Sequence, residues 1–320
     1  MKVVFFGSPS IALPSFFSLI NAGHEITLVI TQPDRKSGRG KKETPSAIKE
    51  IALKKGIPVY QPGKIRKDSL AIEKIREADP DVNIVVAYGQ IIPGGIIYFP
   101  EFHSLNVHFS LLPKYRGAAP VQWAILKGEN KTGVTIFELN EKMDEGDILS
   151  QQETEIFPEE SILELESRLA HLGAHLLVQT LNQIKTINPA KQDSRKATYA
   201  PLLRKEDGNI NWDEEASYIE RQVRAFNPWP SAFTFFNGIR IKILKAKKIR
   251  EKTGGSFKTG EILDIRKTGI IVECGKQSAL LVEKLQPESK KILDAYNFSL
   301  GAKITPGDRF TCEKTNEERD

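Results

Sequence analysis

Residues 104–126 read SLNVHFSLLPKYRGAAPVQWAIL, and they join a strand pattern to a loop rich in proline and glycine. Apolar side chains occupy every second position from Leu105 to Phe109, as on the buried face of a strand. The other face is polar and carries Asn106 and His108. A strand of an apolar domain that gives one face to an amide and an imidazole is a candidate for a functional site.

This strand is the last in a series of short apolar runs that alternate with amphipathic segments. Helical patterns occupy residues 44–56 and 68–80. The strand-like runs before 104 are KVVFFG (2–7), EITLVIT (25–31), PVYQP (58–62) and VNIVVAY (82–88). The alternation predicts an α/β domain with a Rossmann-like, mostly parallel sheet that is covered by helices on both faces. Ligands of such domains bind beyond the carboxyl ends of the strands.

Beyond residue 130 the pattern changes. Residues 133–140 and 148–156 predict a hairpin, and a leucine stripe predicts a long helix over 161–184. A polar stretch without periodicity follows, and then several short strand-like runs with glycine turns, which predict a small antiparallel β-barrel of the OB-fold kind. The predicted organisation is a first domain at 1–189, a linker at 190–207, a barrel domain at 208–314 and a tail at 315–320.

The composition is that of a globular protein large enough for two domains, with 320 residues, 40% hydrophobic and 27% charged. Only Cys274 and Cys312 occur, which excludes a disulfide framework and a cysteine metal cluster. Gly7, Pro9 and Pro14 interrupt the first apolar run, which favours a strand over a signal peptide, and no run is long enough to span a bilayer. We expect a cytoplasmic protein that does not contact membranes.

The net charge of +5 is distributed unevenly along the chain. The first 190 residues are close to neutral, and the remainder is basic. A basic half is typical of a protein that binds a polyanion, but modest basicity also serves solubility. Charge alone leaves both interpretations open.

Motifs for several other chemistries are incomplete. FFGSPS, after the first strand, has one glycine where a dinucleotide-binding loop needs three, and the chain has no G-x-x-x-x-G-K-[ST] loop for phosphates. His171 and His175 have the spacing of a metal pair on a helix, but they lie opposite the leucine stripe and lack a third ligand nearby. We expect exposed histidines and no metal site.

Asn106 and His108 lie near the carboxyl end of their strand, where this architecture binds its ligands. An amide can donate to an oxygen, and a histidine near neutrality can give or take a proton. Together they suit a reaction in which a carbonyl carbon becomes tetrahedral and a proton moves. The alternative is a hydrogen-bonded polar pair that only fixes the strand edge.

The stretch from Asn106 to Pro120 resembles the signature of the folate-dependent formyltransferases, N-x-H-x-S-x-L-P followed by R-G-x-x-P. Four more stretches are similar to the branch of that family that formylates charged initiator tRNA, and they come in the family's order. They are TQPDRKSGRGKK, VVAYGQIIP, GVTIFELNEKMDEGDIL and AFNPWP. The similarity extends over nearly the whole chain.

This resemblance implies transfer of a formyl group from 10-formyltetrahydrofolate to the amino group of initiator methionyl-tRNA. It identifies Asn106, His108 and Asp144 as the catalytic residues. Asn106 and His108 would hydrogen-bond the developing oxyanion, and Asp144 would hold His108 and favour its protonated form. The family pattern D-x-G-D selects Asp144 over the neighbouring Glu145 and Asp147. No metal or covalent intermediate is implied.

The resemblance also implies two sets of binding residues. Those expected to contact folate are Ser110, Leu111, Leu112 and Pro113 on one side and Val86, Ala87, Tyr88, Gly89 and Ile91 on the other. Those expected to contact tRNA are Arg35, Lys36, Arg39, Lys41, Lys42, Arg240, Lys242 and Lys248. Alternation along a strand would array the last three on one side. An edge strand that lysines protect from association is the alternative for several of them.

Two other functions compete with this interpretation. A formyltransferase for a nucleotide sugar amine would use the same catalytic residues, but the basic loop at 35–42 would then have no purpose. A non-catalytic RNA-binding protein on a decayed enzyme scaffold is the second alternative, and the intact Asn106, His108 and Asp144 argue against it. From the family we expect a monomer.

Overall fold

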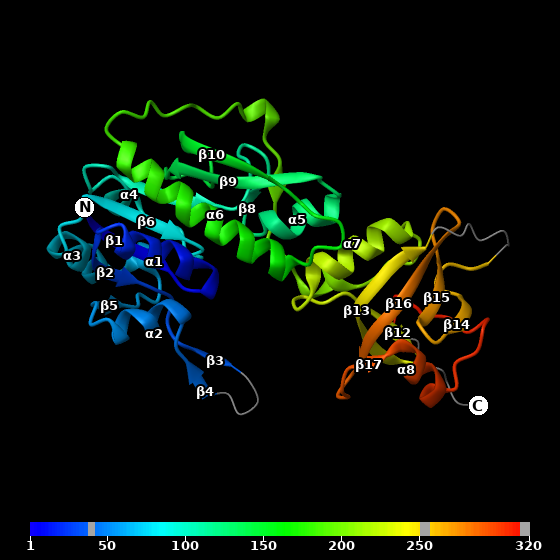
Figure 1. Ribbon diagram of the computed structural model, residues 1–320. Helices are drawn as coiled ribbons and strands as arrows, with labels where there is room; N and C mark the ends of the chain where they lie inside the picture. The colour runs from blue at the N-terminus through cyan, green and yellow to red at the C-terminus, as the bar shows by residue number, and fades with distance from the viewer. Residues whose placement is uncertain (38–41, 250–256, 314–320) are drawn as a thin grey trace. The chain divides into compact units, whose positions relative to one another are not determined.

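The computed structural model describes residues 1–37, 42–249 and 257–313, and it divides into two compact units (Figure 1). Unit 1 comprises Met1–Pro120, Lys131–Glu155 and Leu163–Pro201. Unit 2 comprises Val121–Asn130, Ile156–Ile162 and Leu202–Asp320. Across the described ranges, no helix combines the length and the apolar character needed to cross a membrane.

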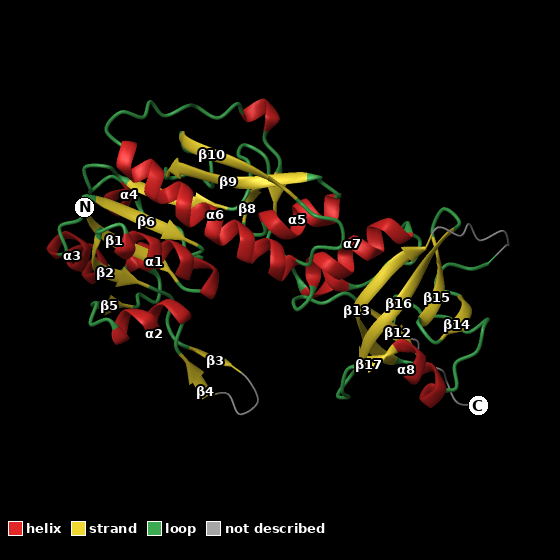
Figure 2. Ribbon diagram, in the orientation of Figure 1, coloured by secondary structure: helices red, strands yellow, loops and turns green. Residues whose placement is uncertain are grey.

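Unit 1 is built around a seven-stranded sheet in the order β10-β9-β7-β6-β1-β2-β5 (Figure 2). The five strands from β7 to β5 are parallel, and β9 and β10 extend the sheet as an antiparallel hairpin. This confirms the mostly parallel α/β sheet predicted from the sequence. The strands are β1 (Lys2–Gly7), β2 (Glu25–Ile30), β5 (Val59–Tyr60), β6 (Val82–Val86), β7 (Ser104–His108), β9 (Lys131–Glu138) and β10 (Ile148–Glu155).

Helices cover both faces of this sheet because successive strand residues point to opposite sides. Phe6 and Val85 belong to one buried cluster with residues of α3 and α4. On the opposite face, Phe5 packs edge to face against Phe16 of α1, with ring centroids 5.3 Å apart. The helices of unit 1 are α1 (Leu13–Asn21), α2 (Ala47–Lys54), α3 (Ser69–Glu77), α4 (Gly94–Ile97) and α6 (Ile162–Gln183).

The long helix α6 lies close against β7 and β9. A Cβ atom on Gly173 would stand 2.8 Å from Cγ1 of Val107 and 3.2 Å from Cγ1 of Val134. Glycine at this position therefore allows the close approach of helix and sheet. Since Val107 faces α6, its neighbours Asn106 and His108 face the other side of the sheet.

Two small strand pairs lie outside the main sheet of unit 1. The antiparallel pair β3 (Arg35–Ser37) and β4 (Lys42–Thr44) follows β2. The parallel pair β8 (Arg116–Gly117) and β11 (Tyr199–Ala200) ties the loop after β7 to the stretch after α6. Gly117 has a φ of +122°, and a Cβ there would lie 2.6 Å from the backbone oxygen of Ala200, so this pairing requires glycine.

Unit 2 contains an antiparallel sheet in the order β12-β13-β16-β15-β14, with β17 paired to β16. Residues 309 and 311 form bridges with residues 261 and 235, so one short segment joins both edges of the sheet, as closure into a barrel requires. The antiparallel second domain is thus confirmed. Its strands are β12 (Phe233–Phe236), β13 (Ile239–Ile249), β14 (Ile262–Arg266), β15 (Gly269–Cys274), β16 (Ser278–Pro287) and β17 (Leu293–Asp294).

The helices α7 (Ala216–Phe226) and α8 (Ala295–Ala302) contact this sheet, and α5 (Pro120–Lys127) belongs to unit 2 from Val121 onward. In α7 the buried residues Ile219, Val223 and Phe226 recur at helical spacing and give the helix one apolar face.

Strand β13 does not keep a single alternation along its length. Lys242 stands between the buried Ile241 and Ile243 and points outward, and Arg240, two residues before it, shares its side of the strand. The register against β16 then shifts twice between residues 243 and 246. Beyond the shifts Lys248 pairs with Leu280 and stands two residues after the buried Ala246, so it lies on the side of the strand opposite Lys242, although its own side chain is exposed at the strand end. The expectation that all three basic residues share one side is therefore wrong, because the bulge exchanges the two faces.

Candidate active site

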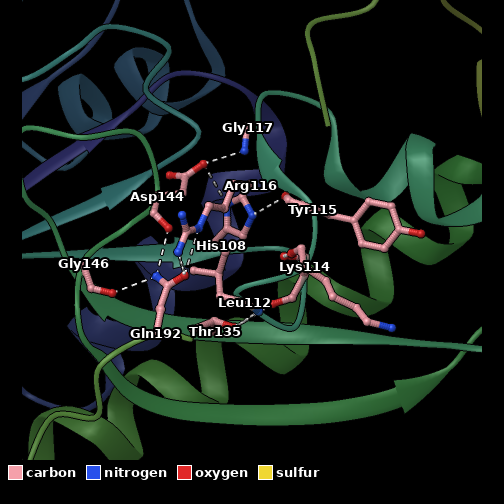
Figure 3. Close-up of polar contacts among 11 residues, drawn as sticks. His108, Leu112, Lys114, Tyr115, Arg116, Gly117, Thr135, Asp144, Gly146 and Gln192 are labelled. Atoms are coloured by element: carbon pink, nitrogen blue, oxygen red, sulfur yellow. Dashed lines mark hydrogen bonds and ion pairs between the residues drawn. The ribbon is translucent and has the colours of Figure 1, made fainter. Parts of the chain in front are cut away.

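His108 ends β7, and its imidazole lies between two partners (Figure 3). Its Nε2 atom is 3.0 Å from the backbone oxygen of Tyr115. Because a carbonyl oxygen only accepts, Nε2 carries the proton of this hydrogen bond. The Nδ1 atom faces Asp144, with 3.8 Å between Nδ1 and Oδ2. Nδ1 is therefore the ring nitrogen that remains for proton transfer.

Asp144 approaches His108 from the turn between β9 and β10. Its Oδ2 accepts a 2.7 Å hydrogen bond from the backbone N–H of Gly117. The turn lies so close to β9 that a Cβ on Gly146 would overlap the backbone oxygen of Glu138. Glycine at 146 thus lets the hairpin carry a carboxylate to the end of β7, far from it in sequence.

Asn106 shares the face of β7 with His108, since the two residues are two apart on a strand. It is half-buried, and its amide has no hydrogen-bond partner among the described residues. An uncommitted amide N–H beside an imidazole can donate to an oxygen of a ligand. The structure therefore brings together the three residues that the resemblance identified.

Two residues that the sequence analysis did not assign to the site hold the Asp144 turn (Figure 3). The amide of Gln192 donates to the backbone oxygens of Asp144, at 2.9 Å, and of Gly146, at 2.7 Å. Its Oε1 accepts from Arg116 Nε at 3.0 Å and Nη2 at 2.8 Å. Arg116 Nη1 also lies 3.2 Å from Glu145 Oε1. Gln192 belongs to the stretch predicted as a linker, where neither periodicity nor composition indicates such contacts.

The loop after β7 contains four residues expected to contact folate. Ser110 and Leu112 are buried, and Leu111 and Pro113 are half-buried. The hydroxyl of Thr135 donates to the backbone oxygen of Ser110 at 2.7 Å and accepts from the N–H of Leu112 at 3.1 Å. The loop is thus anchored to β9, and Leu111 and Pro113 are its more accessible side chains.

The segment after β6 contains the other five residues expected to contact folate. Ala87, Gly89 and Ile91 are exposed, whereas Val86 and Tyr88 are buried. Burial raises the pKa of the Tyr88 hydroxyl well above its ordinary value. The exposed members are available to a ligand, and the buried ones support them from the core.

The basic residues expected to contact tRNA fall in both units. Arg39 and Lys41 lie outside the described residues. Arg35, Lys36 and Lys42 belong to the β3–β4 pair. In unit 2 the guanidinium of Arg240 lies over the ring of Phe233, 3.7 Å from its centroid. Lys242 is half-buried and Lys248 is exposed.

Both histidines of the i, i+4 pair on α6 are exposed, as predicted. Nδ1 of His171 lies 2.8 Å from the backbone oxygen of Ser167 in its own helix. Within the described ranges, no group of three potential metal ligands occurs.

Comparison with known families gives two matches that together extend over most of the chain. The family described as formyl transferase matches residues 1–181. The family described as formyl transferase, C-terminal domain, matches residues 202–303.

Individual relatives are similar over the same length. The methionyl-tRNA formyltransferase of Geobacter metallireducens is 42% identical over 312 residues, which cover 97% of this chain and 98% of the relative. The methionyl-tRNA formyltransferase of Bacillus subtilis is 41% identical over 309 residues, which cover 96% of each. Among solved structures, WlaRD, a sugar 3N-formyl transferase in the presence of dTDP and 5-N-formyl-THF, has a TM-score of 0.64 at 20% identity, covering 91% of this chain and 99% of that one. At that identity the likeness shows the fold.

Proposed function

The chain belongs to the methionyl-tRNA formyltransferases, and from this we propose that it transfers the formyl group of 10-formyltetrahydrofolate to the amino group of methionine on initiator tRNA. The observation that supports the assignment of catalytic residues most strongly is the 3.8 Å separation of Asp144 Oδ2 from His108 Nδ1. It occurs at the end of a strand that also presents the amide of Asn106.

In the proposed reaction the neutral amine attacks the formyl carbon, and the carbonyl oxygen gains negative charge. The amide of Asn106 donates to this oxygen, which is worth about 3 kcal/mol for one well-placed donor. His108 takes the proton of the attacking amine at Nδ1, and the resulting imidazolium also stabilises the oxyanion. Asp144 balances the positive charge on the ring. The proton then passes through a water to the folate nitrogen as the donor's C–N bond breaks.

The binding residues follow from the same proposal. Folate lies between the loop at 110–113 and the segment at 86–91, whose exposed backbone can read the edge of the pterin. The basic residues of the β3–β4 region and of β13 contact the phosphates of the tRNA. We further propose that the protein acts in the cytoplasm as a monomer, which sedimentation at assay concentration would test.

A direct assay separates the proposed function from its competitors. Purified protein receives a radiolabelled formyl donor together with charged initiator tRNA, charged elongator tRNA or an amino-sugar nucleotide. Formylation restricted to the initiator tRNA supports the proposal. Formylation of the sugar nucleotide alone would replace it with the sugar-directed reaction, and tRNA binding without any transfer would indicate a non-catalytic protein.

A further inference from the structure

Gln192 lies in irregular backbone between α6 and β11. Ala190, two residues before Gln192, exchanges two backbone hydrogen bonds of 2.8 Å with Ile148, the first residue of β10. This stretch therefore runs beside the turn that carries Asp144, although the two are far apart in sequence.

The amide of Gln192 makes four hydrogen bonds. Its two N–H groups are shared between the backbone oxygens of Asp144 and Gly146, and its oxygen accepts twice from Arg116. A primary amide has two donors and two lone pairs, so its bonding capacity is fully used. The side chain therefore has one orientation that satisfies all of its partners.

Arg116 holds this amide in a fixed position. Its side chain is only 2% exposed, so its charge has left water and needs partners in the protein. The partners are Oε1 of Gln192 and, at 3.2 Å, Oε1 of Glu145. A buried, planar guanidinium with fixed partners cannot move without breaking several bonds together.

The turn is thus held at two points. Gln192 holds the backbone on both sides of Glu145, and the N–H of Gly117 holds the Asp144 carboxylate at 2.7 Å. Asp144 itself has a φ of +53°, in the left-handed region that is less favourable for a residue with a side chain than for glycine. The contacts compensate for this cost and determine where Oδ2 lies relative to Nδ1 of His108.

We propose that Gln192 and Arg116 are positioning residues for Asp144 in the transfer reaction. Neither lies between the reacting groups, and both act by fixing the turn at 144–146. This inference rests on the proposed function, because it assigns Asp144 a role in turnover.

The variant Gln192→Glu tests the inference. A glutamate keeps the length of the side chain and two acceptors for Arg116, but it has no N–H for the carbonyls of Asp144 and Gly146. We expect kcat to fall by about 10- to 100-fold, since a shift of ~1 Å in a catalytic group costs about 10²-fold. The KM for charged tRNA should stay within about twofold. Gln183→Glu, at an exposed position at the end of α6, is the matched control and should leave kcat unchanged.

A double-mutant cycle distinguishes positioning from general damage. Under single-turnover conditions, Gln192→Glu should lower the rate in the wild type but not further in the Asp144→Asn background. An equal loss in both backgrounds, or a wild-type kcat for Gln192→Glu, would overturn the inference.

Hydrogen exchange separates this inference from the proposed function. The amides of residues 145–147 should exchange at least about tenfold faster in Gln192→Glu than in the wild type, whether or not the protein formylates tRNA. Unchanged exchange would refute the role of Gln192 even in an active enzyme. A wild-type protein that transfers no formyl group, with faster exchange in the variant, would refute only the proposed function.

Discussion

The hydrogen bond from His108 to the backbone oxygen of Tyr115 gives His108 and Asn106 different roles in the reaction. It places the ring proton on Nε2, so in the neutral ring Nδ1 has a free lone pair and faces Asp144. Nδ1 can therefore accept a proton but cannot donate one until it has done so. The amide of Asn106 is then the donor available to the oxyanion from the start of the reaction.

Replacing Asn106 tests whether its amide is the hydrogen-bond donor to the oxyanion. Asn106→Ala should lower kcat by about 10²- to 10³-fold, the usual loss for one oxyanion donor, because the oxygen loses its neutral hydrogen-bond donor. The affinity for charged tRNA should not change. Stopped assays and filter binding would measure both. Asn182→Ala, at an exposed position on α6, serves as the control, and a similar loss in it would point to a nonspecific effect.

Glu138, at the end of β9, should make the free energy of unfolding depend on pH. Burial and the nearby Asp147 raise the pKa of its carboxyl, so the folded protein holds the proton more tightly than the unfolded chain. Stability is therefore lost as the pH rises through the unfolded pKa towards the folded one. Glu138→Gln should melt at a higher temperature than the wild type at neutral pH.

The pH dependence provides the control for this effect. The advantage of Glu138→Gln should shrink as the pH falls towards about 4, the ordinary glutamate pKa, because the native carboxyl then becomes neutral as well. Glu101→Gln, at an exposed position, should show no such trend. A difference that does not vary with pH would mean that lost packing, and not charge, explains the effect.

At the scale of elements, the close contact of α6 with β7 and β9 depends on a single missing methyl group. Gly173→Ala should destabilise unit 1 by about 1–3 kcal/mol, because the added Cβ meets Val107 and Val134 in a packed layer. Gly95→Ala, in α4 of the same unit, has open space around its Cβ and should be neutral or stabilising by up to about 1 kcal/mol. Chemical denaturation would measure both. A stabilised Gly173→Ala would show that helix and sheet are farther apart.

The sequence predicts elements well where one local pattern determines them. The runs at 2–7, 25–31 and 82–88 form β1, β2 and β6. The leucine stripe forms α6 within one residue of the predicted helix at each end. Prediction from the sequence fails where contacts with residues distant in the chain determine the local structure. The register shifts in β13 depend on the pairing with β16, and the contacts of Gln192 depend on a turn more than 40 residues earlier, so neither leaves a periodic signal. The resemblance of the motifs identifies Asn106, His108 and Asp144. Spacing alone does not distinguish Asp144 from its acidic neighbours.

At the scale of the whole molecule, the basic second half predicts a salt-dependent affinity for tRNA. Each phosphate neutralised by a lysine or arginine adds about 0.7–0.9 to the slope of log K against log salt. Lys242 is on the outward side of β13, so Lys242→Ala should weaken binding and reduce the slope by about one. Lys185→Ala, at an exposed position in unit 1, should leave the slope unchanged. An unchanged slope in Lys242→Ala would place the tRNA elsewhere.

Single-turnover formylation of charged initiator tRNA by His108→Ala, with the tRNA dissociation constant measured on the same protein, tests the catalytic assignment most directly. We predict that the rate falls by about 10²-fold or more, the contribution of a general base, while the dissociation constant stays within about threefold. A variant that formylates at a near-normal rate would contradict the account, because no proton transfer through Nδ1 could then be required.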